Sequence, residues 1–166
     1  MISSFYGQTN FPILSILRET EDAIAEIRGS AAYPNISGMA KFYRTVYGVI
    51  VYTEVTGLPD SGGNGIFGYH IHEGTSCRGN ETDAFADALT HYNPANAEHP
   101  YHAGDLPPLF SNNGFALSVV LTDRFDLREV IGRTLIIHSK PDDFVSQPSG
   151  NAGEKIACGI IQVSRE

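Results

Sequence analysis

From Gly38 onward, apolar and polar residues alternate with a period of two in short segments rich in β-branched and aromatic side chains, a pattern typical of half-buried β-strands. Turns that contain Gly, Pro or Asn separate these segments, and an Asn-Asn-Gly turn indicates a hairpin. The stretch 15–26 stays open, because its first part suits a short amphipathic helix and its Ala-Ile-Ala-Glu-Ile end suits a strand. The predicted strands cover residues 38–45, 47–55, 65–72, 106–111, 114–122, 133–138 and 155–164.

This order of elements contains neither a sequence repeat nor the alternation of strands and helices that builds a parallel sheet. We therefore predict an all-β fold, an eight-stranded antiparallel Greek-key sandwich or flattened barrel. Two connections, residues 73–104 and 139–153, are much longer than ordinary turns. Connections of that length are usually either functional or disordered, and the histidines decide for function.

The composition limits the class of protein. A chain of 166 residues fits one domain with a single core. A net charge of -8 argues against a nucleic-acid partner, because phosphate binding needs a basic face. No apolar run is long enough to cross a bilayer, so no membrane partner is expected. The run FPILSIL lacks the flanks of a signal peptide, which predicts a cytoplasmic protein, or an exported one if a leader has been removed.

Four of the six histidines form a set of nitrogen ligands. His70 and His72 are two residues apart on a predicted strand, so their side chains emerge on the same face. His138 ends a different strand, and His91 lies in the first long connection. Four imidazoles gathered at one end of a barrel suit copper in a near-planar arrangement.

A second ligand set, His91, His99, His102 and Asp105, lies within fifteen residues of turn-forming sequence. Three imidazoles and one carboxylate make a closed tetrahedral zinc site, which is structural rather than catalytic. Six histidines fill four copper and three zinc positions only if His91 serves both ions as an imidazolate, with one ring nitrogen facing each metal. We therefore expect the two long loops to form the metal site.

Five blocks of sequence closely resemble, in this order, the signature of the copper/zinc superoxide dismutase family: GYHIHEGTSC, HYNP, HAGDLP, IGRTLIIH and PSGNAGEKIACGII. The resemblance extends over residues 23–166 and leaves residues 1–22 as an N-terminal extension of unknown role. It implies the two metals on the sets described above, with copper at His70, His72, His91 and His138 and zinc at His91, His99, His102 and Asp105.

The resemblance also bears on Cys77 and Cys158. From the residues alone, the two cysteines could form one long-range disulfide or remain two buried thiols. A cytosolic chain favours the thiols, because the cytosol keeps cysteines reduced. The resemblance instead implies a disulfide that ties the first long loop to the last strand. It further implies that Asp142 is the carboxylate that links a copper histidine to a zinc histidine through hydrogen bonds.

Lys155 departs from the family pattern, because it stands where the family has an arginine beside the copper channel. Lysine keeps the charge that attracts a small anion but lacks the planar fork, so we expect a slower enzyme. The interval from His99 to His102 and the loop after His138 are also shorter than usual in the family. Reduced loop cover would weaken the electrostatic guidance that Lys155 and, more weakly, Lys140 provide.

The activity implied by the resemblance is that of an oxidoreductase. Copper bridged to a structural zinc by His91 would disproportionate superoxide to oxygen and hydrogen peroxide, with His91 as proton carrier and Lys155 attracting the superoxide anion. The alternative is a non-enzymatic copper/zinc-binding or copper-transfer domain with the same fold. Loss of a copper histidine would mark that alternative, and none is missing. The family is commonly dimeric, which allows a homodimer, although the sequence identifies no interface.

Overall fold

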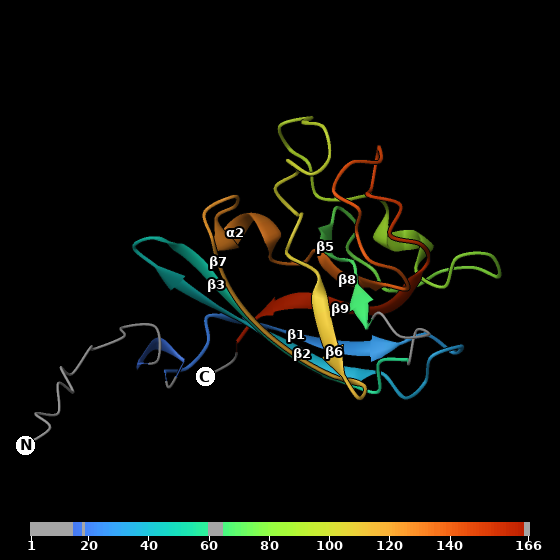
Figure 1. Cartoon of the computed structure of the whole chain (residues 1–166). Helices are drawn as coiled ribbons and strands as arrows, with labels where there is room; N and C mark the ends of the chain where they lie inside the picture. The colour runs from blue at the N-terminus through green and yellow to red at the C-terminus, as the bar shows by residue number, and fades with distance from the viewer. Residues whose placement is uncertain (1–14, 18, 60–64, 165–166) are drawn as a thin grey trace, which may run out of the picture.

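The computed structural model describes residues 15–17, 19–59 and 65–164, and most of its regular structure is antiparallel β-strand (Figure 1). Nine strands form one sheet within these residues: β1 (Ala23–Gly29), β2 (Ser37–Thr45), β3 (Gly48–Thr56), β4 (Ile66–Phe67), β5 (Tyr69–His72), β6 (Leu109–Asn112), β7 (Phe115–Thr122), β8 (Thr134–His138) and β9 (Lys155–Val163). The predicted all-β, antiparallel fold is confirmed.

The sheet is arranged in the order β4-β6-β7-β3-β2-β1-β9-β8-β5. Its two end strands, β4 and β5, are consecutive in the chain and are separated by Gly68 alone, so the sheet nearly closes into a barrel. The sequence predicts one strand here, whereas the structure has two, because β4 pairs with β6 and β5 pairs with β8. The Gly68 N–H donates to the Lys140 carbonyl at 2.7 Å. This break accounts for nine strands where eight are predicted.

Strand β1 shows how the alternating pattern builds the core. Ala23, Ala25 and Ile27 are fully buried, while Glu26 and Arg28 face outward. The sequence leaves a helix or a strand open for residues 15–26, and the structure has a strand from residue 23 onward. The buried face of β1 belongs to one hydrophobic core with side chains from five other strands, namely Phe42, Phe67, Tyr69, Leu135 and Ile156.

Two short helices were not predicted, η1 (Ala86–Ala88) and α2 (Leu127–Val130). The sequence does carry a signal for α2, since Asp126 and Glu129 form a capping box. No described helix is both long and apolar enough to cross a membrane. The predicted N-terminal extension, 1–22, lies mostly outside the described residues, so the division into an extension and a domain stays a prediction.

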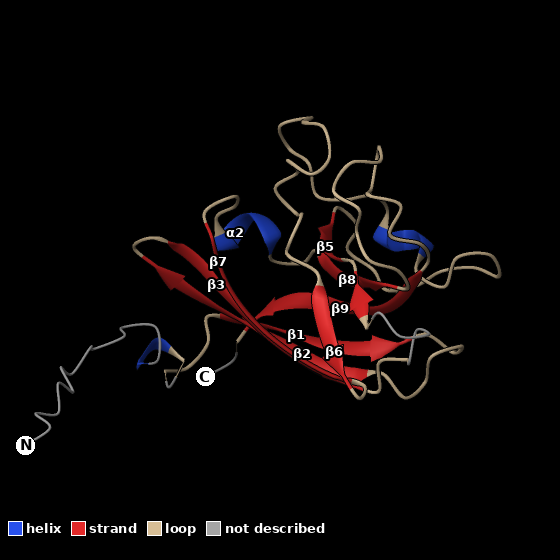
Figure 2. Cartoon of the chain, in the orientation of Figure 1, coloured by secondary structure: helices blue, strands red, loops and turns tan. Residues whose placement is uncertain are grey.

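Both predicted long loops lie on the same side of the barrel, next to β5 and β8 (Figure 2). The first follows β5 and carries η1, and the second joins β8 to β9. A disulfide joins Cys77 of the first loop to Cys158 of β9, 81 residues apart, which confirms the pairing that the resemblance implies. The loops cover the face of β5 that points away from the core.

Candidate metal centre

The centre is built on the outward face of β5. Tyr69 and Ile71 point into the hydrophobic core, so the alternate residues His70 and His72 point toward the loops. The loops cover them completely, because His70 is 0% and His72 is 2% exposed. Isolated backbone bridges join His72 to His91 and His70 to Asp105, and thereby bring segment 91–105 against β5.

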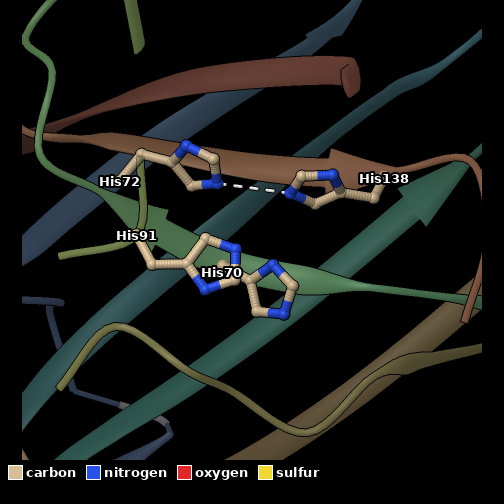
Figure 3. A group of neighbouring side chains, drawn as sticks. All are labelled: His70, His72, His91 and His138. Carbon is tan, nitrogen blue, oxygen red and sulfur yellow. Dashed lines mark hydrogen bonds between the residues drawn. The ribbon is translucent and has the colours of Figure 1, made fainter. Parts of the chain in front are cut away.

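The four predicted copper ligands, His70, His72, His91 and His138, turn one ring nitrogen each toward a common space (Figure 3). These four nitrogens all lie within 4.8 Å of one another, and all four residues are buried. β5 supplies two of them, β8 supplies a third at its last residue, and the first long loop supplies His91. The strand ladder therefore fixes three of the four positions.

Backbone carbonyls set the tautomers of His72 and His138. His72 Nδ1 lies 2.9 Å from the Leu89 carbonyl oxygen, and His138 Nδ1 lies 3.1 Å from that of Gly153. A carbonyl oxygen only accepts, so each Nδ1 carries the ring proton. The two Nε2 atoms then face each other with lone pairs across 3.2 Å. Facing lone pairs repel unless a cation or a proton lies between them, so this pair fits a bound metal ion.

His70 and His91 also present ring nitrogens that are suited to bind a metal ion. His70 Nε2 donates to Asp142 at 2.7 Å, and its Nδ1 is buried without a hydrogen-bond partner. His91 Nε2 is also buried without one. Buried polar atoms are seldom left unpaired, and a ligand nitrogen is an exception that needs no protein partner. Burial lowers the pKa of His70 to about 4 and that of His138 to about 3, so both rings are neutral at neutral pH, the form that binds a metal.

The predicted zinc ligands form a second buried group, His91, His99, His102 and Asp105, again with ligand atoms within 4.8 Å of one another. Asp105 lies at its centre: its carboxylate oxygens are 2.7 Å from His91 Nδ1, 3.1 Å from His99 Nδ1 and 3.4 Å from His102 Nδ1. Three imidazole nitrogens and one carboxylate, with no fifth ligand in this group among the described residues, fit the four-coordinate zinc chemistry expected from the sequence.

Asp142 connects the two groups. Its two carboxylate oxygens accept hydrogen bonds from His70 Nε2 at 2.7 Å and from His99 Nε2 at 2.9 Å. Burial raises the pKa of Asp142, but the hydrogen bonds from His70, from the Phe144 N–H and from His99 outweigh it and hold that pKa far below its usual range. The neighbouring Asp143 instead accepts hydrogen bonds from Ser146 at the surface. The carboxylate between the histidines is therefore Asp142.

Lys155 lies beside the predicted copper ligands. It is the backbone partner of His138 across β8 and β9, and both line an open cavity of about 1170 Å³ together with His72. Its ammonium donates to Asp83 at 2.6 Å and to the Phe85 carbonyl at 3.2 Å. Lys140, the second predicted source of positive potential, is exposed and is not among the described residues that line this cavity.

Contacts that support the ligands from outside were not predicted. The side-chain amide of Gln147 pairs with both backbone groups of His99, and Arg124 donates to the carbonyls of Pro100 and His102. These contacts join segments far apart in the chain, and their residue types are common on any protein surface. No pattern in a single sequence distinguishes them.

A barrel that holds six buried imidazoles in two adjoining ligand groups, with one ring shared between them, defines a protein that binds two metal ions. The family model for copper/zinc superoxide dismutase matches residues 36–161. The chain belongs to the copper/zinc superoxide dismutase family, and is thus an oxidoreductase of superoxide with copper and zinc as its metals. This confirms the family, the enzyme class and the two cofactors expected from the sequence.

Named relatives agree with the family. A Cu-Zn superoxide dismutase of Aquifex aeolicus is 33% identical over 142 residues, 76% of this chain and 80% of that protein. One of Legionella pneumophila is 32% identical over 158 residues, 90% of this chain and 93% of that protein. One of Photobacterium leiognathi is 34% identical over 139 residues, 75% of this chain and 78% of that protein.

Proposed function

We propose that copper is held by His70, His72, His91 and His138, that zinc is held by His91, His99, His102 and Asp105, and that superoxide is disproportionated to oxygen and hydrogen peroxide at this centre. The position of His91 carries the proposal: its Nδ1 lies in the zinc group, while its unpaired Nε2 lies in the copper group. Bound copper supplies the one-electron redox couple, and bound zinc supplies a fixed charge that eases loss of the second ring proton of His91.

We assign proton delivery to His91 Nε2. Nδ1 of this ring is engaged with Asp105 at 2.7 Å, so Nε2 is the nitrogen that can gain and release a proton. His91 also lines the cavity that reaches His72 and His138. Formation of hydrogen peroxide from superoxide consumes protons, and a ring nitrogen next to the reacting anion can supply one.

We assign attraction and orientation of superoxide to Lys155. Among the described residues that line the cavity, it is the one lysine or arginine. A lysine presents a point charge without the planar pair of donors that an arginine offers. The expected consequence is a rate below that of the same chain with arginine at this position.

Metal loading followed by measurement of superoxide decay tests these assignments. With copper and zinc bound, as shown by elemental analysis, the wild type should consume superoxide and Lys155→Arg should consume it faster. His91→Ala should lose turnover, whereas Asp143→Asn, which removes an exposed carboxylate next to Asp142, should not. Two bound metals without turnover in either the wild type or Lys155→Arg would overturn the proposal in favour of the copper-transfer domain.

We also propose that the chain forms a homodimer through the outer face of β7. Alternate residues of this strand, Phe115, Leu117, Val119 and Leu121, are 41 to 54% exposed. A continuous apolar stripe on a sheet indicates an interaction surface, and one stripe can pair with its own copy about a two-fold axis. Leu117→Glu should convert a dimer to a monomer in analytical ultracentrifugation, and Val163→Glu, at an exposed site on β9, should not. A monomeric wild type would overturn this.

A further inference from the structure

The charged residues that line the cavity leading to His72 and His138 are mainly negative. Five carboxylates line it against a single lysine or arginine, Lys155, among the described residues: Glu73, Glu81, Asp83, Glu98 and Glu154. An anionic substrate is repelled by such a lining at long range. The reaction therefore depends strongly on where the Lys155 ammonium lies.

Lys155 is held in place rather than free to move. Two of its three ammonium donors are used, by Asp83 at 2.6 Å and by the Phe85 carbonyl at 3.2 Å, and its side chain is only 14% exposed. A lysine side chain is a flexible stem of four carbons, so its charge has a fixed position only where contacts hold the ammonium. One donor remains for an anion in the cavity.

Asp83 is itself fixed by the loop. Its Oδ1 accepts from the Phe85 N–H at 3.0 Å, and its own N–H donates to the Asn80 side chain at 3.0 Å. Burial raises the pKa of Asp83, but the hydrogen bonds from Lys155 and from the Phe85 N–H outweigh it and lower that pKa. The carboxylate is thus charged at neutral pH and forms an ion pair with Lys155.

We propose that Asp83 is a positioning residue for superoxide: it anchors the Lys155 ammonium beside His138 with one donor left for the anion, and it cancels much of the lysine's long-range attraction. The inference rests on the proposed function and adds a residue to it. It predicts two opposite effects of removing the Asp83 charge. Long-range attraction increases, and the position of the ammonium is lost.

Salt separates these two effects, because charges farther apart than a Debye length of about 3 Å at 1 M salt are screened. The variants are Asp83→Asn and Glu81→Gln, each of which removes one carboxylate from the same cavity. At low salt Glu81→Gln should gain up to about threefold in the rate of superoxide decay. Asp83→Asn combines a similar gain with the loss of position, so its low-salt rate should lie about threefold below that of the wild type. At high salt Glu81→Gln should equal the wild type, while Asp83→Asn should fall about tenfold below it. Asp83→Glu should recover part of the loss.

A second background excludes a merely structural role. In Lys155→Met, the change Asp83→Asn should have no further effect on the high-salt rate, because Asp83 acts through the lysine. A loss that persists in Lys155→Met, or equal high-salt rates for Asp83→Asn and Glu81→Gln, would overturn the inference.

The anchor can also be measured without turnover. In metal-free protein at about 1 M salt, Lys155 should react faster with the anionic reagent trinitrobenzenesulfonate in Asp83→Asn than in the wild type, as followed by peptide mass spectrometry. Glu81→Gln should leave the rate unchanged, because long-range attraction of the reagent is screened at this salt. An unchanged Lys155 rate in Asp83→Asn would overturn the inference even if superoxide turnover is normal. Faster labelling in a protein without turnover would leave the anchor intact and overturn the proposed function instead.

Discussion

The proposed copper group and the proposed zinc group are held by different kinds of structure. His70, His72 and His138 lie on β5 and β8, which pair in continuous register from Tyr69 with Ile137. His99 and His102 lie in an irregular connection between β5 and β6. Because a strand ladder fixes its side chains through many backbone hydrogen bonds, the copper side is preorganised by the barrel itself.

The zinc side depends on contacts from other segments. Gln147 accepts from the His99 N–H at 3.0 Å and donates to the His99 carbonyl at 2.8 Å, while Arg124 donates to the carbonyls of Pro100 and His102 at 2.9 and 3.3 Å. Removal of a loop contact should therefore weaken zinc binding more than copper binding. Four variants test this contrast.

Loss of the disulfide should have the largest effect. Cys77→Ser combined with Cys158→Ser should lower the free energy of unfolding by about 4 kcal/mol, because the bond closes a long loop in the unfolded chain. Urea unfolding measures this. Hydrogen exchange should rise in the first long loop and stay slow in β8 and β9. If hydrogen exchange accelerated equally in the loop and in the strands, the proposed difference between loop-held and strand-held ligands would be wrong.

Asp142→Asn should have the next largest effect. An amide cannot accept from both His70 and His99, so zinc affinity should fall about 10- to 100-fold. Copper affinity should fall less, because three of its four proposed ligands are held by strands. Competition with a chelator measures both constants, with Asp143→Asn as the control. Equal losses for the two metals would show that the two groups are not held differently.

The same contrast explains how much of the molecule can be predicted from its sequence. The strands carry a period-two pattern, so β2, β3, β7 and β9 are predicted nearly to the residue. The break at Gly68 is not predicted, because it arises from pairing with two different neighbours rather than from the local sequence. Local pattern determines local structure, and pairing partners decide the rest.

Within the centre, the residues that were predicted are those whose chemistry is rare. Six histidines in two ligand groups stand out in any sequence. The amide of Gln147 and the backbone carbonyls of Leu89 and Gly153 do not, because every residue has a carbonyl. Asp83 likewise lies 72 residues from Lys155, and nothing local marks the pair.

Gln147→Ala should weaken zinc alone. Among the described residues, the amide bonds to the backbone of His99 alone. We therefore expect a loss of zinc affinity of about fivefold, the effect of two neutral hydrogen bonds partly replaced by water. Copper affinity should not change. Gln162→Ala, an exposed glutamine on β9, is the matched control. A similar loss of copper would mean that the second loop supports both groups.

Asp22→Asn should have the smallest effect and should spare both metals, because Asp22 directly precedes β1 and its side chain bonds to Arg44 of β2, away from both ligand groups. Burial raises the pKa of Asp22, but hydrogen bonds from the Arg44 N–H at 2.7 Å and from Arg44 Nε at 2.8 Å outweigh this effect and lower that pKa from its ordinary value. A carboxyl group whose pKa is lower in the folded state stabilises the protein at pH values above its pKa in the unfolded state. This stabilisation is lost as the pH falls through the pKa of the folded state. The variant should therefore lose about 1 kcal/mol of unfolding free energy at pH 7, and the difference from wild type should shrink below about pH 4.

Urea unfolding at several pH values measures this difference, with Asp123→Asn, which removes an exposed carboxylate, as the control. A deficit that is the same at pH 3 and pH 7 would show that the Asp22 side chain stabilises the barrel by shape rather than by charge.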